Sequence, residues 1–467
     1  MSILPAAEAR FAAEAEVLVI GGGACGLVAA LAAQDAGAVP LVLERDPAPS
    51  GSTALSSGFV PAAPTRFQAA QGIADSAAGF AADILRKAHG EADPGLVEAV
   101  TRESGPALEW LADRHGLEWQ VLDDFLYPGH SAHRMHAVPE RTGAGLIARL
   151  ATAAGAGGID LVCDARVTAL FADGESRVLG VRLERPDGGA EDLACHALVL
   201  ACNGYGGDPA LVRRHVPQLA DALYFGHRGN TGDALRWGEA LGGEGTDLSA
   251  AQGHGSVAIP HGILITWALM MAGGIQVNSA GNRFSNEHQG YSEQAIDVLR
   301  QPGGQAWCVY DARLHELGMG FPDYRDAVAQ GAVRSGANAA ALAAATGLPE
   351  GALSAAIAET AADEPDRFGR DIGATPPLTA PFHAIRVTGA LFHTQGGLRI
   401  DRQARVLRRG SDAPLPNLLA GGGAARGVSG RQISGYLSGN GLLTAVTLGR
   451  IAGRTAAALT AGERGRP

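Results

Sequence analysis

Short apolar runs and Ala-rich segments alternate at the start of this chain. The run Glu16–Ile20 reads Glu-Val-Leu-Val-Ile, and such a β-branched, apolar stretch predicts a buried strand. It leads directly into Gly21–Gly26, after which Leu27–Ala36 predicts an Ala-rich helix. Leu41–Leu43 predicts a second strand, which ends at Glu44. Together these elements predict a βαβ unit of about 30 residues, and such a unit requires a parallel sheet.

The later pattern predicts that this sheet domain is interrupted and then resumed. Residues 69–154 have a mostly helical pattern, whereas 159–181 and 197–201 predict strands. The apolar run 418–421 predicts a strand that returns to the first domain, and 441–459 predicts a closing helix. The first domain is therefore expected to be discontinuous in sequence.

The composition shifts near Gly232, where a different kind of segment begins. That segment mixes short strands with Ala-rich helices, most clearly over residues 335–362. We expect the first domain to cover residues 1–231 and 378–467, and an inserted α+β domain to cover 232–377. This is an α/β fold built on a discontinuous Rossmann-like domain.

The composition excludes several classes of protein. Glycine makes up 66 of 467 residues without a Gly-X-Y period, and 46% of residues are apolar, which excludes collagen and disorder. The net charge of −11 argues against a nucleic-acid partner. The sequence has no membrane-spanning apolar run and no signal-peptide pattern, so we expect a cytoplasmic protein. Five cysteines without a C-x-x-C pattern indicate free thiols and no metal site.

The first glycine cluster has the pattern of a dinucleotide-binding turn. Gly21 permits a tight turn, Gly23 lets the backbone approach a pyrophosphate, and Gly26 lets helix and strand pack closely. The helix that follows offers free N–H groups to the phosphates. Glu44 follows Gly26 by 18 residues and can accept hydrogen bonds from ribose hydroxyls. The alternative is an ordinary Gly-rich turn beside a surface glutamate.

A second loop, Gly51-Ser-Thr-Ala-Leu-Ser-Ser-Gly58, follows the acidic residue and suits the remaining half of a long cofactor. With it, the chain resembles the flavoprotein family of fumarate reductase, succinate dehydrogenase and the 3-ketosteroid dehydrogenases. The matching pieces are Val17–Gly26, Gly51–Gly58, Ala201–Gly206, Gly229–Asp233, Gly273–Glu287, His393–Gly397 and Ala420–Gly453. The resemblance implies an FAD-binding domain, a capping domain, and a substrate held between them against the flavin.

The resemblance also implies the residues that contact the cofactor. The loop after the first strand has no histidine where some members attach flavin covalently, so we expect noncovalent FAD. The expected FAD contacts are Gly21, Gly23, Ala24, Cys25, Gly26, Glu44, Arg45, Gly51, Ser52, Thr53, Ser56, Ser57, Gly58, Val167, Ala201, Asn203, Gly204, Asn230, Asp233, Gly422, Ser438, Asn440, Leu442 and Leu443.

Two departures from the family pattern carry the functional argument. Fumarate reductases use arginines to clamp two carboxylates and to donate a proton, and the guanidinium fork suits a carboxylate. Tyr291 stands at the position of the catalytic arginine, and Tyr436 at that of the carboxylate-binding arginine. The family's two histidines are kept as His254 and His393. The pattern therefore disfavours a dicarboxylate substrate.

Tyrosines at these two positions resemble the 3-ketosteroid dehydrogenases. Tyr436-Leu-Ser438 is similar to the Tyr-x-Ser of their 4-dehydrogenase branch, and Asp124-Phe-Leu-Tyr127-Pro is similar to a third tyrosine segment. The chain has only 7 tyrosines, so three matches are informative, although each could also be a buried structural residue. The resemblance implies a catalytic set of Tyr291, Tyr436, Ser438, Tyr127, His254 and His393.

Tyrosine suits the removal of two hydrogens beside a ketone. A donor must hold the ketone oxygen as enolate charge develops, and a neutral phenol can do so in an apolar pocket. A base must remove the α proton, and a tyrosine with a reference pKa of about 10 needs help to do so. By family analogy Tyr436 polarises the ketone and Tyr291 is the acid/base. We expect His254 or Arg431 to supply a positive neighbour.

These observations lead to one preferred function and two alternatives. We expect an FAD-dependent α,β-dehydrogenase of a cyclic ketone or 3-ketosteroid, with hydride passing to flavin N5 and electrons leaving to an external acceptor. The alternatives are an enoate or enone reductase of the fumarate reductase type and a noncatalytic flavin electron-transfer module. His130, His133 and His136 share one irregular segment, which we expect to line the substrate entrance rather than to bind metal.

Overall fold

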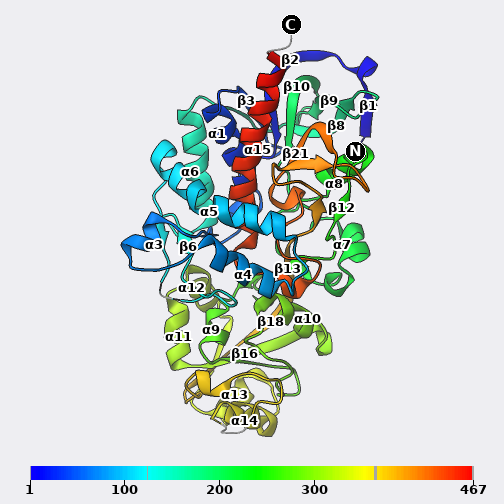
Figure 1. Ribbon diagram of the computed structural model, residues 1–467. Helices are drawn as coiled ribbons and strands as arrows, with labels where there is room; N and C mark the ends of the chain where they lie inside the picture. Colours follow the sequence, from blue (N-terminus) through cyan, green and yellow to red (C-terminus); the bar gives the residue numbers. More distant parts are fainter. Residues whose placement is uncertain (1, 124, 362–364, 465–467) are drawn as a thin grey trace. The chain divides into compact units, whose positions relative to one another are not determined.

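The computed structural model describes residues 2–123, 125–361 and 365–464 of the chain (Figure 1). The chain folds into two compact units, and its path crosses between them four times. Unit 1 comprises Met1–His215, Gly226–Ala251 and His393–Pro467, and unit 2 comprises Val216–Phe225 and Gln252–Phe392. The observed architecture is mixed α/β, with one unit inserted into the other, as the sequence predicts.

Unit 1 is built on a mainly parallel sheet. Its strands are β1 (Ser2–Pro5), β2 (Phe11–Ile20), β3 (Pro40–Leu43), β7 (Asp160–Val162), β8 (Arg166–Ala172), β9 (Val178–Glu184), β10 (Ala190–Leu200), β20 (Arg405–Leu407) and β21 (Pro414–Ala420). Among the described residues these nine strands follow the order β1-β8-β9-β10-β2-β3-β7, with β21 paired to β10 and β20 to β21. The parallel pairs β21-β10-β2-β3-β7 are the Rossmann-like centre.

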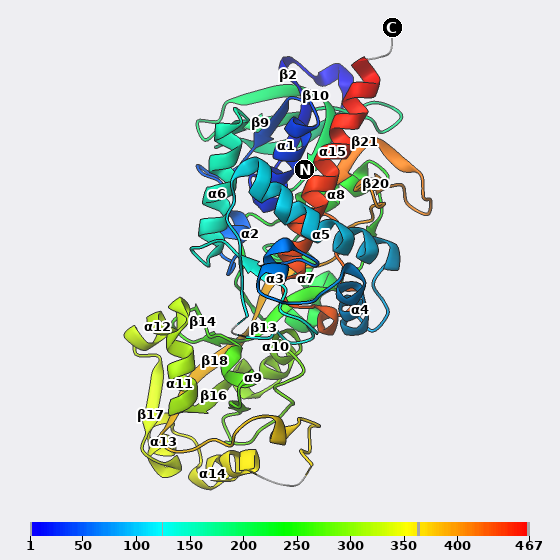
Figure 2. The same ribbon diagram turned by 60° about the vertical axis from the view of Figure 1, so that its left-hand side comes forward.

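Helices cover this sheet and connect its strands (Figure 2). They are α1 (Ala24–Asp35), α2 (Gly51–Ala54), α3 (Arg66–Ala70), α4 (Ala77–Lys87), α5 (Pro94–His115), α6 (Gly143–Ala156), α7 (Pro209–His215), α8 (Asp233–Ala240) and α15 (Asn440–Arg464). Short strands β4 (Val60–Pro61), β5 (Gln120–Val121) and β6 (Met135–Ala137) form a separate small sheet, and β12 (Gly245–Thr246) pairs with β19 (Gly397–Leu398).

Helix α15 lies along α1, and glycines permit the close approach (Figures 1 and 2). A Cβ at Gly453 would lie 2.1 Å from the Ala29 carbonyl oxygen, and one at Gly449 would lie 2.6 Å from that of Cys25. Residues Ala24–Ala33 of α1 are all buried, which explains its small, apolar sequence. The helix predicted at the C-terminus is therefore the partner that buries the dinucleotide-type helix.

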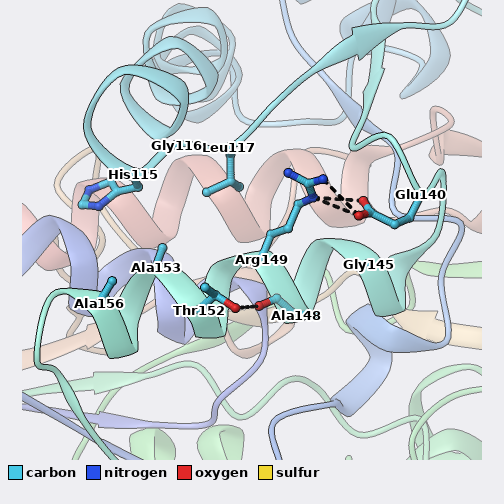
Figure 3. A pocket seen from close by; sticks show the side chains of 10 residues that line it. All are labelled: His115, Gly116, Leu117, Glu140, Gly145, Ala148, Arg149, Thr152, Ala153 and Ala156. Carbon is cyan, nitrogen blue, oxygen red and sulfur yellow. Dashed lines mark hydrogen bonds and ion pairs between the residues drawn. The ribbon is translucent and has the colours of Figure 1, made fainter.

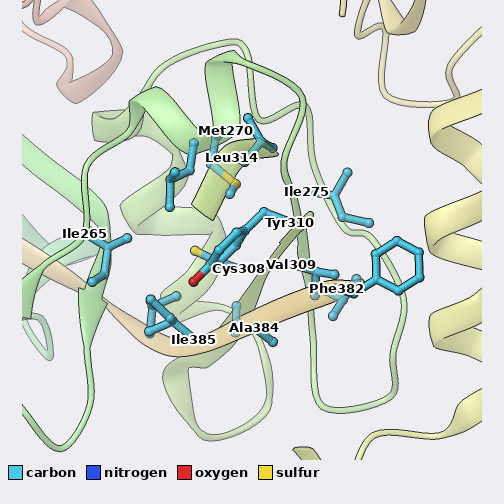
Figure 4. Packing of buried hydrophobic residues seen from close by; sticks show 14 of the residues in the cluster. Ile265, Met270, Ile275, Cys308, Val309, Tyr310, Leu314, Phe382, Ala384 and Ile385 are labelled. Carbon is cyan, nitrogen blue, oxygen red and sulfur yellow. The ribbon is translucent and has the colours of Figure 1, made fainter. Parts of the chain in front are cut away.

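Unit 2 is an α+β unit around a second sheet. Its strands are β11 (Leu223–Tyr224), β13 (Ala251–Ala258), β14 (Ile263–Leu264), β15 (Ile275–Val277), β16 (Gln305–Asp311), β17 (Val333–Gly336) and β18 (Phe382–Thr394). Its helices are α9 (Ala268–Met271), α10 (Tyr291–Leu299), α11 (Ala312–Met319), α12 (Pro322–Ala329), α13 (Ala339–Thr346) and α14 (Glu350–Ala358). Figure 4 shows its core, in which Cys308 and Tyr310 of β16 lie among aliphatic side chains such as Ile265 and Ile385.

The observed boundaries differ from the predicted ones in three places. Residues 216–225 belong to unit 2, in which β11 pairs with β18. Residues 232–251 belong to unit 1, because β12 pairs with β19, and residues 378–392 belong to unit 2, because β18 completes its sheet. The Ala-rich helices predicted over 335–362 are α13 and α14, which follow the end of β17 and are separated by Gly347 (φ +76°) and Pro349. Ala362 lies outside the described residues.

Candidate functional site

The dinucleotide-type turn has the geometry that its sequence predicts. Gly21 has a φ of +109°, and a Cβ on Gly26 would lie 1.8 Å from the Gly21 carbonyl oxygen. The buried Glu44 ends the neighbouring strand, and its Oε2 accepts a hydrogen bond of 2.6 Å from Gly22 N–H. Glu44 therefore holds the turn as well as ending the second strand.

The second predicted loop packs directly against the first. Thr53 Oγ1 accepts from Ala24 N–H at 3.1 Å, at the start of α1. Ser56 Oγ donates to the Thr53 carbonyl at 2.7 Å and accepts from Gly58 N–H, whereas Ser57 is exposed. Gly51 and Gly58 both have positive φ, which favours glycine. The turn and the Ser/Gly loop thus form one continuous backbone surface.

A third segment, residues 227–233, is fastened to the same place. Arg45 Nη1 donates to the Gly229 carbonyl at 2.6 Å, and Asn230 Nδ2 donates to Ser52 Oγ at 2.8 Å. Asp233, in the next turn, accepts from the Thr231 hydroxyl at 2.8 Å. These two hydrogen bonds hold residues 229 and 230 beside Arg45 and Ser52. The predicted contacts Asn230 and Asp233 therefore lie close to the predicted contacts Arg45 and Ser52.

The remaining predicted cofactor residues lie near the strand ends of the sheet and at the start of α15. Asn203 has a φ of +65° and follows Ala201, and a Cβ on Gly423 would lie 2.1 Å from Asn203 Oδ1. A Cβ on Gly422 would approach Cys25 at 3.2 Å, so Gly422 lies beside the start of α1. Val167 is buried on β8, and the chain just before it is tied to Glu44 by an Ala165 N–H bond to the Glu44 carbonyl. Leu442 and Leu443 lie in the first turn of α15.

These residues fit an FAD. The start of α1 supplies amides without intrahelical partners, and glycines leave no side chain in front of them. The buried Asn440 adds a polar atom: among the described residues its Oδ1 has no hydrogen-bond partner. A buried acceptor of this kind is rarely left unsatisfied, and a flavin N–H would satisfy it.

Tyr436 and His393 meet in unit 1. Their rings lie edge to face at 5.7 Å, and Tyr436 is only 6% exposed. Burial raises the pKa of Tyr436 well above its ordinary value near 10, so its hydroxyl stays protonated. Burial also lowers the pKa of His393 to about 4, although the Thr394 carbonyl acts in the opposite direction. At neutral pH both groups are uncharged hydrogen-bond donors.

Ser438 and Tyr127 lie on neighbouring segments of unit 1. The Ser438 carbonyl accepts from His130 Nε2 at 2.9 Å, and a Cβ on Gly129 would lie 2.7 Å from Leu437. Tyr127, three residues before His130, is half-buried and packs edge to face with Phe59 and Phe125. Asp124 of the same motif lies outside the described residues. The structure thus anchors the Tyr127 segment to the loop that carries Tyr436 and Ser438.

Two histidines of this segment, His130 and His136, are held by hydrogen bonds within unit 1, and the substrate-entrance role of the segment stays a prediction. His136 bonds Thr65 Oγ1 at 2.8 Å and the Arg134 carbonyl at 2.9 Å, and His130 adjoins the fully buried Arg134. Arg134 pairs with Asp75 at 2.9 Å and Asp83 at 2.6 Å. Within the described parts of the chain, no group of three His, Cys, Asp or Glu residues could hold a metal ion.

Tyr291 and His254 meet in unit 2. Their rings stack at 4.8 Å with 17° between the planes, and Phe392 stacks on His254 at 5.3 Å with Trp267 edge-on. The His254 Nδ1 atom has no hydrogen-bond partner in the described part of the chain. Tyr291 is the first residue of α10, after Gly290 with a φ of +140°.

A buried ion cluster fixes the loop that precedes Tyr291. Glu287 accepts from Arg283 Nη2 at 2.9 Å and Arg370 Nη1 at 3.1 Å, and all three side chains are almost fully buried. Asn286 Oδ1 accepts from the backbone of His288 at 2.9 Å. The Asn-Glu pair of the sequence motif therefore positions the start of α10.

His254 does not supply the positive charge expected beside the tyrosines, whereas the same expectation for Arg431 stays a prediction. Burial lowers the pKa of His254 to about 3, so this histidine is neutral at pH 7. Arg431 is exposed, with 75% of its side chain accessible, and its guanidinium lies 3.6 Å from Asp247. Sequence reasoning could not detect either effect, because burial and pairing depend on the fold.

Several residues of these clusters were not singled out from the sequence. Gln395, Ser429, Phe392 and Trp267 contact the predicted histidines directly or through one hydrogen bond. Gln395 and Phe392 flank His393 in the sequence, so their proximity to the motif was the one available signal.

One surface pocket is lined by none of these residues. Figure 3 shows a pocket of about 350 Å³ between the end of α5 and α6, lined by residues that include His115, Leu117 and Arg149. Arg149 is engaged by Glu140 in two hydrogen bonds of 3.0 Å. None of the predicted site residues lines this pocket.

A family profile described as "FAD binding domain" matches residues 16–442. The chain belongs to this family. The chain is therefore a member of the FAD-dependent fumarate reductase and succinate dehydrogenase flavoproteins. It has the FAD-binding domain of these oxidoreductases. Within the described residues no helix is long and apolar enough to cross a membrane.

Similar proteins include both reductases and dehydrogenases. The chain is 30% identical to an NADH:fumarate oxidoreductase of Klebsiella pneumoniae over 95% of its own length, but spans 47% of that relative. It is 26% identical to a 4-oxocyclohexanecarboxylate 2-dehydrogenase of Sinomonas cyclohexanicum, covering 96% of this chain and 93% of that one.

Two solved structures have the same fold. A flavocytochrome c3 fumarate reductase superposes with a TM-score of 0.82 at 28% identity, covering 97% of this chain and 80% of that one. A 3-ketosteroid-Δ4-(5α)-dehydrogenase from Rhodococcus jostii RHA1 gives a TM-score of 0.77 at 25% identity, covering 97% and 99%.

Proposed function

We propose that the protein is an FAD-dependent α,β-dehydrogenase of an uncharged cyclic ketone or 3-ketosteroid. The observation that carries the proposal is the presence of Tyr291 and Tyr436 where the fumarate-reducing pattern has arginines. The named similarity to a cyclic-ketone dehydrogenase and a ketosteroid dehydrogenase supports it. In the reaction the α carbon loses a proton, the β carbon loses a hydride, and the ketone becomes an enone.

The cofactor is proposed to be noncovalent FAD, which when bound supplies the hydride acceptor at its N5. Gly21–Gly26 and Glu44 would hold its adenosine and phosphate half, and the Gly51–Gly58 loop would continue along it. Asn440 would hold a flavin N–H through its unpartnered Oδ1. Cys25, at the start of α1, is buried, and burial raises the pKa of its thiol to about 12, so it is inert as a nucleophile.

Tyr436 is proposed to hold the ketone oxygen. Its hydroxyl is buried and protonated, and a preorganised neutral donor stabilises a developing enolate most strongly where water is excluded. His393, whose ring lies edge-on to Tyr436, is a second neutral donor for the same oxygen. Ser438 and Tyr127 are proposed to extend this hydrogen-bonding set.

Tyr291 is proposed to take the α proton as a phenolate, after its own hydroxyl proton has passed to solvent. It is the half-buried first residue of α10, stacked on His254, and we assign it the acid/base role of the arginine at the matching position of the family pattern. Because His254 is neutral, the stack offers polarisable apolar surface and no fixed charge. We therefore propose that the proton passes directly from the α carbon of the substrate to the phenolic oxygen of Tyr291.

The absence of charge argues for a neutral substrate. The site residues proposed to meet the substrate are three tyrosines, a serine and two histidines, and both histidines are uncharged at pH 7. A carboxylate transferred from water to such surroundings would lose its hydration without a guanidinium partner. Dicarboxylates are therefore expected to bind poorly.

The second candidate is an enoate or enone reductase that uses the same residues in the opposite direction. It is favoured by the fumarate reductase names among the similar proteins. A noncatalytic electron-transfer role is disfavoured by the retained His254 and His393. The electron acceptor and the cytoplasmic location remain predictions from the sequence.

Two assays on the purified flavoprotein separate these functions. The first incubates cyclic ketones and 3-ketosteroids with an artificial two-electron acceptor and measures enone products that are two hydrogens lighter. The second offers fumarate with reduced viologen and follows viologen oxidation. We expect enone formation and no fumarate reduction. Fumarate turnover without any enone would establish the reductase instead.

A further inference from the structure

A chain of buried hydrogen bonds ends on His393, and we propose that it locks the tautomer of this histidine. Asn440 Nδ2 donates to Ser429 Oγ at 3.1 Å, and Ser429 Oγ donates to Gln395 Oε1 at 2.8 Å. Gln395 Nε2 lies 3.0 Å from His393 Nδ1. The whole chain belongs to unit 1.

The direction of these bonds fixes the proton on His393. Ser429 Oγ accepts a hydrogen bond from Asn440 Nδ2 and donates its own hydroxyl hydrogen to Gln395 Oε1. The other end of the Gln395 amide is then an N–H₂ group, which can only donate. His393 Nδ1 must therefore accept, and its proton lies on Nε2. The Thr394 carbonyl, 3.3 Å from Nδ1, is the weaker competing partner.

The side chains that fix the proton of His393 are buried, so their hydrogen bonds determine its position. Gln395, Ser429 and Asn440 are 4%, 1% and 0% exposed, so water does not compete for their hydrogen bonds. Burial also lowers the pKa of His393, which keeps the ring neutral with one proton to place. Gln395 is thus a positioning residue: it presents an Nε2–H donor on the ring that adjoins Tyr436.

The catalytic use of this donor rests on the proposed function. With the proton on Nε2, His393 and Tyr436 can both donate to one ketone oxygen. With the proton on Nδ1, the ring would direct a lone pair at the developing enolate and would repel it. The tautomer itself is a property of the protein and does not depend on which substrate is used.

The direct test is nitrogen NMR of the FAD-loaded protein labelled with ¹⁵N-histidine. The His393 signals are those absent from a His393→Asn sample, and pyrrole-type and pyridine-type nitrogens differ strongly in shift. We expect Nδ1 to be pyridine-type and Nε2 to be protonated. A protonated Nδ1 would overturn the proposal, because Gln395 would then have to present its oxygen to His393 instead of its N–H₂ group.

Gln395→Glu is the decisive variant because it keeps the shape and removes the donor. The carboxylate can only accept, so we expect the proton to move to Nδ1, with FAD content unchanged. Flavin reduction by a reactive ketone should slow by about tenfold or more, because a wrong tautomer removes the donor. The exposed Gln71→Glu adds the same charge elsewhere and should change neither quantity.

A second variant keeps the test informative if Gln395→Glu does not fold. Ser429→Ala breaks the link between Asn440 and Gln395 and should give His393 a mixture of tautomers. An unchanged Nδ1 signal in both variants would overturn the lock. If the native tautomer is as proposed but no ketone reduces the flavin, the proposed function fails and the lock stands.

Discussion

Removal of a single hydroxyl group, in Tyr436→Phe, is the sharpest perturbation of the proposed chemistry. The ring stays in place, and with it the edge-to-face contact with His393. Tyr436 is 6% exposed, so water cannot replace the missing donor at the ketone oxygen. Loss of one preorganised donor to a developing oxyanion costs about 2.7–4 kcal/mol, or about 100–1000-fold in rate. FAD binding should be retained, since the hydroxyl is not among the proposed cofactor contacts.

The assay is anaerobic stopped-flow reduction of the flavin by a reactive ketone. Tyr310→Phe is the matched control: it removes a buried phenol that bonds Tyr324 in the core of unit 2. The control should reduce at the native rate, although it loses about 1 kcal/mol of stability. A Tyr436→Phe rate within about threefold of native would refute the role assigned to the hydroxyl.

Three further predictions concern the fold that supports the site. Gly26→Ala places a Cβ 1.8 Å from the Gly21 carbonyl oxygen, so it should destabilise the FAD domain by about 1–3 kcal/mol or more and cause loss of flavin. Gly155→Ala, where a Cβ would meet no other atom, should leave stability unchanged. Thermal unfolding measures both effects. Arg134→Met removes the buried arginine that pairs with Asp75 and leaves Asp83 with only Arg86 as an ion-pair partner. It should cost about 3–5 kcal/mol in urea unfolding, and an unchanged midpoint would contradict the burial of this ion cluster. Stability should fall as the pH drops from about 6.5 to 4, because the unfolded chain binds protons there that the buried histidines exclude, and a flat unfolding midpoint across this range would refute the depressed pKa values. The histidines concerned are His130, His136, His254 and His393.

The parts of the fold that the sequence predicted best are those in which local pattern and tertiary role coincide. The strand, glycine turn and helix around Gly21–Gly26 form as expected, because β-branched residues favour the strand, Gly21 permits the positive φ of the turn, and small residues suit the buried helix. The long Ala-rich segment was predicted less well. Alanine has no strong amphipathic period, so only Gly347 and Pro349 mark the break between α13 and α14.

The sequence predicted which residues form the site, but not how buried they are or which of them carry a proton. The family resemblance gave Tyr436, His393, Tyr291 and His254 as members of one catalytic set, and the structure adds that Tyr436 contacts His393 in unit 1 and Tyr291 contacts His254 in unit 2. Protonation states could not be predicted, because desolvation depends on neighbours that are distant in sequence. The hydrogen-bond chain to His393 was missed for the same reason: Ser429 lies 34 residues from Gln395.

The most direct test of the central claim is an anaerobic titration of the oxidised flavoprotein, followed by its visible absorbance. The titrants are succinate and a ketone series from cyclohexanone to 3-ketosteroids. The account predicts that at least one ketone bleaches the flavin and that succinate does not. Bleaching by succinate, with no response to any ketone, would contradict it.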